Sequence, residues 1–300
     1  MAHADWVTGA CCPRTDQDLG LLALARGRWS EARQRLQRSL AAAEQQQMPE
    51  EAAVSRRHLA ELELRQGHIQ AAIDQSTKAQ ASFAQREDPR GASDAGLLHV
   101  EALLAAHALP EAEKTLQALQ PSLDEAPSEQ RATAQLLAAE VALQRGDRAL
   151  ALRHVRDARK LAAGSGIRQL LLRIDLLQAQ AGNRLDPALD DATAALGHVG
   201  LRLRWLELAM RQALAAHDYA AAGKLYDEAA TLLRGGDSIE APTLHVLGAA
   251  ARAGLGDSAG ARAAQLRADE ARTKLAAGIP ARLRAQFDAA AARVRPERTP

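Results

Sequence analysis

Hydrophobic positions recur at steps of three and four residues along most of the chain, a spacing that predicts amphipathic helices. Leu136, Leu137, Val141 and Leu143 show this spacing within one segment. The strict polar and apolar alternation of a half-buried strand does not occur in the sequence at any useful length. The pattern therefore predicts an all-α protein.

A short phrase divides the expected helices into pairs: a small or polar turn residue followed five residues later by alanine. It occurs as Gly27 and Ala32, Gly67 and Ala72, His107 and Ala112, Gly146 and Ala151, His217 and Ala222, and Gly256 and Ala261. A seventh copy has Gly182 followed by Ala188, one residue out of step. Successive turn residues lie 40, 40, 39, 36, 35 and 39 residues apart. A repeat of this period predicts a stack of helical hairpins.

Glycine, proline and capping residues set the expected ends of the helices, as where Asp186 precedes Pro187. The expected helices are 13–26, 29–47, 50–66, 69–86, 92–106, 110–120, 128–145, 148–163, 167–181, 187–196, 201–216, 219–234, 242–254, 258–277 and 280–294. Residues 1–12 are expected to be a disordered lead-in, 13–278 a superhelical domain, 279–294 a capping helix and 295–300 a disordered tail.

The segment Gly27-Arg28-Trp29-x-x-Ala32 resembles the turn of a tetratricopeptide repeat, and so does His217-Asp218-Tyr219-x-x-Ala222. Leu19-Gly20 is similar to the Leu-Gly pair of that family. The resemblance covers residues 13–278 and implies a right-handed α-solenoid of about seven hairpins with a C-terminal capping helix. Four features depart from the family. The period exceeds its usual length of about 34 residues, no copy has the aromatic residue at the start of its first helix, the terminal proline of the repeat is irregular, and the fifth repeat is degenerate.

The end of the repeat region, residues 279–287, is similar to the closing helix of longer repeats in helical sensor regions of bacterial transcription activators and receptor-type kinases. This likeness implies an alternative setting for the chain. It would be the sensor or regulatory half of a larger transcription regulator or Ser/Thr kinase, gating an effector domain encoded elsewhere. An open reading frame that extends upstream of Met1 would favour that alternative.

Composition restricts the class of partner. Hydrophobic residues make up 47% of the chain but aromatic residues only 2%, which suits thin, alanine-rich helix packing. The net charge of +1, from 38 basic and 37 acidic residues, gives no support for nucleic-acid binding. Cys11 and Cys12 are adjacent and have no other cysteine to pair with, which favours a reducing, cytoplasmic setting. No apolar run is long enough to predict a membrane span or a secretion signal.

In tetratricopeptide stacks the first helix of each hairpin lines a concave groove, and the residue six positions before each turn is expected to face it. Three consecutive hairpins then offer Glu61, Glu101 and Glu140, with Arg57 beside them, and Asp175 extends the row if the fifth hairpin slips by one residue. Further along the groove the expected residues are Arg204, Glu207 and Arg211. Such an arrangement would orient an extended peptide of complementary charge. In the alternative, the acids pair with arginines of the adjacent hairpin and stay solvated.

No catalytic or metal-binding motif is present: the sequence has neither HExxH nor a Cys-x-x-Cys pair, and we expect no cofactor. His58, His99 and His245 lie on first helices and are candidates to face the groove, and Trp205 is either a groove anchor or a core residue. The sequence therefore predicts a non-catalytic scaffold or adaptor that binds a protein or peptide in its groove, in bacterial signalling or regulation. It does not determine the oligomeric state.

Overall fold

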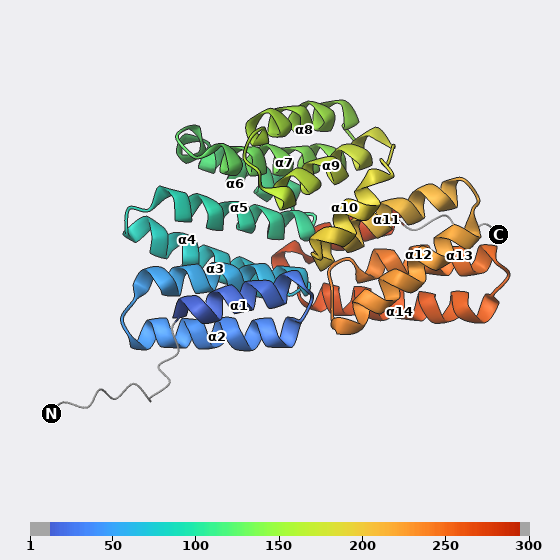
Figure 1. Ribbon diagram of the computed structural model, residues 1–300, viewed down its shortest axis with the longest axis horizontal. Helices are drawn as coiled ribbons and strands as arrows, with labels where there is room; N and C mark the ends of the chain where they lie inside the picture. Colours follow the sequence, from blue (N-terminus) through green and yellow to red (C-terminus); the bar gives the residue numbers. More distant parts are fainter. Residues whose placement is uncertain (1–12, 295–300) are drawn as a thin grey trace.

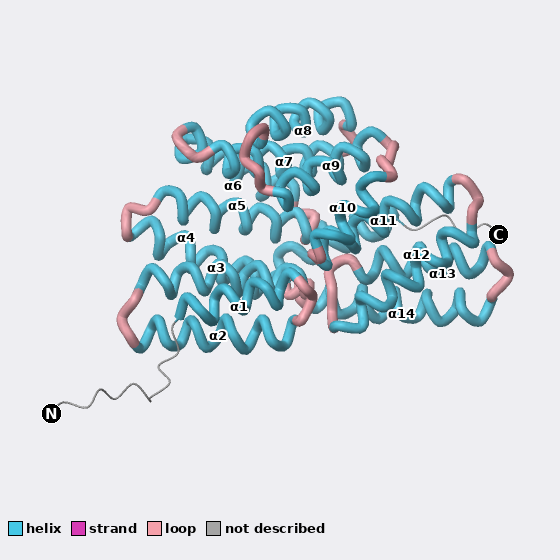
Figure 2. The backbone as a smooth tube through the Cα atoms, viewed as in Figure 1, coloured by secondary structure: helices cyan, strands magenta, loops and turns pink. Residues whose placement is uncertain are grey.

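The computed structural model describes residues 13–294, and in that range the chain consists of helices joined by short turns, without a strand (Figures 1 and 2). The α-helices are α1 Pro13–Ala25, α2 Trp29–Gln45, α3 Pro49–Arg65, α4 Ile69–Gln85, α5 Pro89–Ala105, α6 Leu109–Asp124, α7 Ser128–Gln144, α8 Arg148–Ala162, α9 Arg168–Gly182, α10 Ala188–Leu196, α11 Val199–Ala215, α12 Tyr219–Leu232, α13 Ala241–Gly254, α14 Ser258–Ala277 and α15 Arg284–Val294. Short 3-10 turns cover Leu233–Gly235 and Ala281–Leu283. Helices α1 to α14 form seven antiparallel hairpins, numbered here one to seven, as the sequence predicts. The predicted lead-in and tail lie outside the described residues.

The turn residue of each hairpin ends its first helix in the left-handed conformation. Gly67, for example, has a φ of +79°, and its N–H donates to the carbonyl of Leu64 at 3.0 Å. The next N–H, of His68, donates to the carbonyl of Glu63 at 2.8 Å, which completes a Schellman motif. Glycine adopts this conformation without a steric cost, which explains its recurrence at these corners.

The alanine five residues after the turn allows the two helices of a hairpin to approach closely. Ala32, Ala72, Ala112, Ala151 and Ala222 all have 0% of their surface exposed. A larger side chain at these positions would push the helices apart, so the repeated phrase encodes the contact as well as the turn.

The fifth hairpin differs from the sequence prediction. Its left-handed residue is Asn183, with a φ of 58°, and not Gly182, which is the last residue of α9. Ala188 is exposed and the buried position is taken by Leu189. Asparagine tolerates the left-handed region better than other non-glycine residues, which explains why it can replace glycine here.

The predicted start of α5 and the predicted end of α6 also differ from the structure, by three and four residues, and both involve proline. Helix α5 begins at Pro89 instead of residue 92, because Asp88 caps it through a bond from the N–H of Gly91 at 2.9 Å. Helix α6 continues through Pro121 to Asp124. Leu123 is only 2% exposed, and its packing holds the last turn despite the hydrogen bond that Pro121 cannot donate.

The stack of hairpins turns back on itself, so that hairpins six and seven lie beside the turns of hairpins one and two (Figure 1). The N–H of Ile239, before α13, donates to the carbonyl of Arg65 at the end of α3 at 3.0 Å. The N–H of Gln70 in α4 donates to the carbonyl of Gly278, after α14, at 2.8 Å. A Cβ added to Gly27 would lie 3.0 Å from Val199 of α11. These contacts join segments about 170 to 210 residues apart.

The predicted capping segment closes this arrangement. Ile279, Leu283 and Phe287 are 0–5% exposed and belong to one core cluster with Ile69 and Leu103 of hairpins two and three. The segment opens with the 3-10 turn and becomes α-helical only at Arg284. Arg282 and Asp288 of this segment are exposed, while its apolar residues pack the end of the chain against earlier hairpins.

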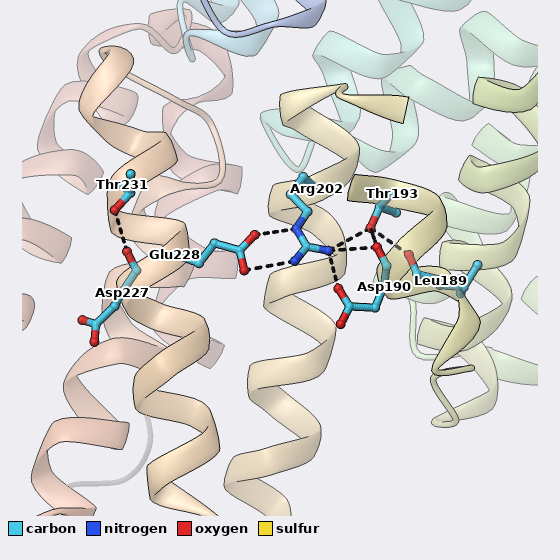
Figure 3. A network of polar contacts seen from close by, with 7 residues as sticks. All are labelled: Leu189, Asp190, Thr193, Arg202, Asp227, Glu228 and Thr231. Carbon is cyan, nitrogen blue, oxygen red and sulfur yellow. Dashed lines mark hydrogen bonds and ion pairs between the residues drawn. The ribbon is translucent and has the colours of Figure 1, made fainter. Parts of the chain in front are cut away.

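Arg202 of α11 joins the short fifth hairpin to the sixth (Figure 3). On one side its Nε and Nη2 donate to the two carboxylate oxygens of Glu228 in α12, at 2.6 and 3.0 Å. On the other side its Nη1 donates to the carboxylate of Asp190 at 2.6 Å and to Thr193 Oγ1 at 3.2 Å, both in α10. The guanidinium carbon lies 4.3 Å from the ring centroid of Trp205. One planar side chain therefore holds three helices together.

Candidate functional site

Charged side chains from the first helices of hairpins two to six converge on one cavity of about 250 Å³ at the inner wall of the superhelix. Its charged lining includes Arg65 of α3, Glu101 of α5, Glu140 of α7, Arg173 of α9 and Arg204 of α11. We call this the inner cavity. These helices meet because each hairpin is rotated slightly from the previous one, so the corresponding faces turn toward a common axis.

Glu101 is the central acid of the inner cavity. Its Oε1 accepts a hydrogen bond of 2.7 Å from Nη2 of Arg173, and its Oε2 lies 3.7 Å from Nη2 of Arg65. Burial alone would raise the pKa of Glu101, but the two guanidinium groups outweigh it and the pKa lies below its usual value. Glu101 also raises the pKa of Arg173. Both side chains therefore stay charged although they are largely withdrawn from solvent.

Glu140 and Arg204 are more loosely paired, with 3.8 Å between Oε1 of the acid and Nη2 of the arginine. Arg204 instead donates a hydrogen bond of 2.7 Å to Oε1 of Gln180. Among the described residues, no group donates a hydrogen bond to the carboxylate of Glu140 within the usual limits. Glu207, which also lines the inner cavity, accepts a bond of 2.8 Å from Arg211 one helical turn away.

Arg65 has the least satisfied side chain of the inner cavity. Its guanidinium lies 3.7 Å from Glu101 and 3.9 Å from Glu61, distances longer than a hydrogen bond. Its Nε is buried without a hydrogen-bond partner in the described part of the chain. A guanidinium carries five donors, and leaving them unpaired in a partly buried position is costly.

His198 forms the neutral part of the lining. Its Nδ1 accepts a bond of 3.3 Å from the N–H of Leu201 and so caps α11, which leaves the ring proton on Nε2. Nε2 lies 3.3 Å from the side-chain amide of Gln169, whose oxygen is the partner that this tautomer requires. Burial, and then the charges of Arg65 and Arg173, lower the pKa of His198 to about 4.

The structure brings together four of the seven residues that the sequence predicts for the groove. Glu101, Glu140, Arg204 and Glu207 line the inner cavity. Glu61 lies next to it, at 3.9 Å from Arg65, and Arg211 lies behind Glu207. Arg57 is outside the lining, with its Nη2 3.2 Å from Nε2 of His58.

Other candidates lie elsewhere. Asp175 pairs with Arg159 of α8 and does not extend the row of acids, because the fifth hairpin presents Leu176 to the inner cavity. His58 and His245 are buried within the hairpin core, 6% and 9% exposed, and His99 bonds Thr77. Trp205 is 6% exposed and belongs to a core cluster, so of its two expected roles, groove anchor and core residue, the structure supports the second.

Sequence reasoning missed Arg65, Arg173 and His198. Arg173 lies three residues before Leu176 and Arg65 lies four residues after Glu61. Each therefore shares a helix face with a position that the repeat pattern singles out. A search one helical turn to either side of those positions would have found both arginines. His198 precedes its helix, and no periodic signal identifies it.

The described residues contain no group of three or more His, Cys, Asp or Glu side chains placed to hold a metal ion. Among them, too, no helix has the length and apolar character needed to cross a bilayer. What the inner cavity offers chemically is recognition, through paired and partly unpaired charges, with apolar side chains such as Leu64, Leu104 and Ile239 between them.

Comparison with solved structures supports the fold. A Rap protein in complex with competence and sporulation factor superposes with a TM-score of 0.66 at 14% sequence identity, covering 91% of this chain and 78% of that chain. A signal-transduction ATPase with numerous domains and a tetratricopeptide repeat sensor, from Pyrococcus horikoshii, gives a TM-score of 0.40 at 14% identity, covering 88% of this chain and 47% of that chain. No family model and no curated protein matches the sequence. The likeness to the Rap protein confirms the predicted tetratricopeptide-like α-solenoid.

Proposed function

We propose that the protein is a non-catalytic binding module whose charged inner wall engages a protein or peptide partner. The observation that carries the proposal is the buried pair of Glu101 and Arg173 at the centre of that wall. A buried ion pair contributes little net stability compared with apolar residues of the same size. Its presence on the face where first helices converge therefore supports a role in recognition. A cytoplasmic setting in bacterial signalling belongs to this proposal.

The size of the inner cavity limits how a partner reaches it. Its volume of about 250 Å³ is below the roughly 300–1,000 Å³ of pockets that hold drug-sized ligands. A folded domain cannot enter it. A partner would insert a short extended segment or a chain end, with the rest of its surface lying on the rim.

The test is partner capture by the full chain. The immobilised protein is exposed to a lysate of its native cells, and bound proteins are identified by mass spectrometry. Variants Glu140→Gln and Arg204→Gln remove two wall charges that are not tightly paired. We expect either variant to reduce capture of the main partner at least tenfold with an unchanged helical circular dichroism spectrum.

A matched control uses Glu113 of α6 and Arg145, the residue after α7, which pair at 2.6 Å and do not line the inner cavity. Their glutamine variants remove the same charges from a pair outside the cavity lining and should leave capture intact. If wall and control variants capture the partner equally, the wall is not the binding surface and the proposal is wrong.

A second candidate is a sensor that binds a small effector and transmits its presence to a partner domain. The contacts that close the superhelix favour it. Ile239 lines the inner cavity and donates its N–H to the carbonyl of Arg65, so the two halves of the chain meet at the cavity itself. A ligand bound there would change how the halves fit together, which is the differential interaction that a switch requires.

A further inference from the structure

We infer that the inner cavity binds a free aliphatic α-amino acid, with its carboxylate at Arg65 and its ammonium group at Glu140. The inference rests on the second candidate function, in which the wall binds a small effector, and it specifies the chemistry of that effector. Three observations support it: a guanidinium and a carboxylate that no described side chain hydrogen-bonds, and an apolar lining of matching size.

Arg65 supplies the anion-binding end. Its nearest acids, Glu101 and Glu61, lie 3.7 and 3.9 Å away, and its Nε is buried without a partner among the described residues. Glu101 already accepts a hydrogen bond from Arg173, so the donors of Arg65 are not required to satisfy its carboxylate. A ligand carboxylate can take two parallel N–H bonds from one guanidinium, which is the geometry that arginine recognises best.

Glu140 supplies the cation-binding end. Its closest cationic group, the guanidinium of Arg204, is 3.8 Å away and donates its hydrogen bond to Gln180 instead. A ligand ammonium has three donors for the carboxylate oxygens that no described residue bonds. Arg65 and Glu140 therefore differ from the other charges of the lining, which are satisfied within the protein.

The balance of charge disfavours a ligand of one sign. Arg65, Arg173 and Arg204 face Glu101, Glu140, Glu207 and Glu240 around one cavity. A simple anion would meet four carboxylates, and a simple cation three guanidinium groups. A zwitterion places each of its charges beside the opposite sign and replaces the solvation that both lose on entry.

Size and lining select the rest of the ligand. A volume of about 250 Å³ admits a single amino acid or a very short peptide. Leu64, Leu104, Leu176, Leu201 and Ile239 supply apolar surface between the charged groups. An aliphatic side chain would bury apolar area there, and each buried methylene is worth about 0.8 kcal/mol in general.

The experiment uses the full chain and isothermal titration with L-leucine, L-isoleucine, L-valine and L-methionine. The decisive probes are N-acetyl-L-leucine, which lacks the positive charge, and L-leucinamide, which lacks the negative charge. We expect saturable binding of at least one aliphatic amino acid, with at least tenfold weaker binding of both of its blocked forms. Because these probes use the unmodified protein, they test the inference even if a variant fails to fold.

Variants then assign the two ends. Arg65→Gln should weaken binding of the amino acid at least tenfold but leave the affinity for its amide, which lacks the carboxylate, unchanged. Glu140→Gln should also weaken binding of the amino acid at least tenfold but leave the affinity for the N-acetyl form, which lacks the ammonium group, unchanged. Arg65→Lys keeps the charge and should lose less affinity than Arg65→Gln. The controls are Arg145→Gln and Glu113→Gln, which remove the same charges from a pair that does not line the inner cavity.

Three results would overturn the inference: no aliphatic amino acid binds at millimolar concentration, the blocked forms bind as well as the free amino acid, or both wall variants bind normally. Binding of a dipeptide such as Leu-Leu without any free amino acid would also overturn it. The partner-capture test separates this failure from failure of the proposed function, because capture that depends on Glu140 and Arg204 would stand without an amino-acid ligand.

Discussion

Nη2 of Arg173 donates a hydrogen bond of 2.7 Å to Oε1 of Glu101, a residue 72 positions earlier in the chain. The bond joins α9 of hairpin five to α5 of hairpin three across the inner wall. Neither residue lies in a hairpin adjacent to the other, so the pair depends on the curvature of the whole stack.

Breaking this pair on one side should be more damaging than removing it entirely. We expect Arg173→Met to lower the free energy of unfolding by about 3 kcal/mol, because the carboxylate of Glu101 stays buried but loses its hydrogen bond, with Arg65 at 3.7 Å. The double variant Arg173→Met with Glu101→Leu should recover at least half of that loss. Urea denaturation followed by circular dichroism measures both. Losses that simply add would show that the two groups do not interact.

Stability should fall with acid through the buried histidines. An unfolded histidine takes up a proton near pH 6.5. In the folded protein, burial and the nearby charge of Arg57 lower the pKa of His58 to about 3. Burial and the charges of Arg65 and Arg173 lower the pKa of His198 to about 4. Below pH 6.5 the unfolded state therefore binds more protons than the folded state. The stability that the neutral, buried histidines allow is fully present above pH 6.5 and is lost as the pH falls toward 4. Each group costs about 1.4 kcal/mol per pH unit in that window.

The variants for this test are His58→Leu and His198→Asn, the second of which retains a capping side chain at the start of α11. Each should reduce the slope of unfolding free energy against pH between 6.5 and 4.5. The histidines with lowered pKa that remain, His99, His107, His154 and His245, keep part of the slope. An unchanged slope in both variants would contradict the assignment.

The left-handed corners predict a graded response to substitution. An added Cβ at Gly146 meets no atom within 4 Å, so Gly146→Ala tests backbone strain alone and should cost about 1 kcal/mol. At Gly67 the same Cβ would lie 2.9 Å from Leu275, and the cost should be larger. His217 has a φ of 57°, and His217→Gly should be neutral or stabilise by up to about 1 kcal/mol. Thermal unfolding ranks the three, and equal costs at Gly146 and Gly67 would rule out the contact with Leu275.

Arg202 should be irreplaceable by lysine. Its guanidinium bonds Glu228 through two nitrogens and reaches Asp190 and Thr193 through the third (Figure 3). A lysine ammonium cannot form this planar arrangement, so Arg202→Lys and Arg202→Gln should each lower stability by about 2 kcal/mol. Arg145→Gln, on an exposed pair, should cost less than about 1 kcal/mol. Full stability of Arg202→Lys would show that only the charge matters.

The sequence by itself determined the hairpins. Turn glycines, buried alanines and the aspartates that cap α8, α12 and α14 act within a few residues of one another, so their effect can be worked out without a fold. The same local rules failed at two positions. Asn183 takes the left-handed corner that the sequence assigned to glycine, and Pro121 lies inside a helix whose last turn is held by the packing of Leu123.

Which charges meet was decided only by the tertiary structure. The repeat pattern identified Glu101 and Glu140 as inward-facing. Their respective partners, Arg173 and Arg204, each lie two hairpins after the acid that they pair with. Their meeting depends on small rotations summed over successive hairpins and on the short α10, and no local signal specifies that sum. The same accumulated curvature brings Ile239 against Arg65 and leaves a small cavity where the sequence predicted a groove for a peptide.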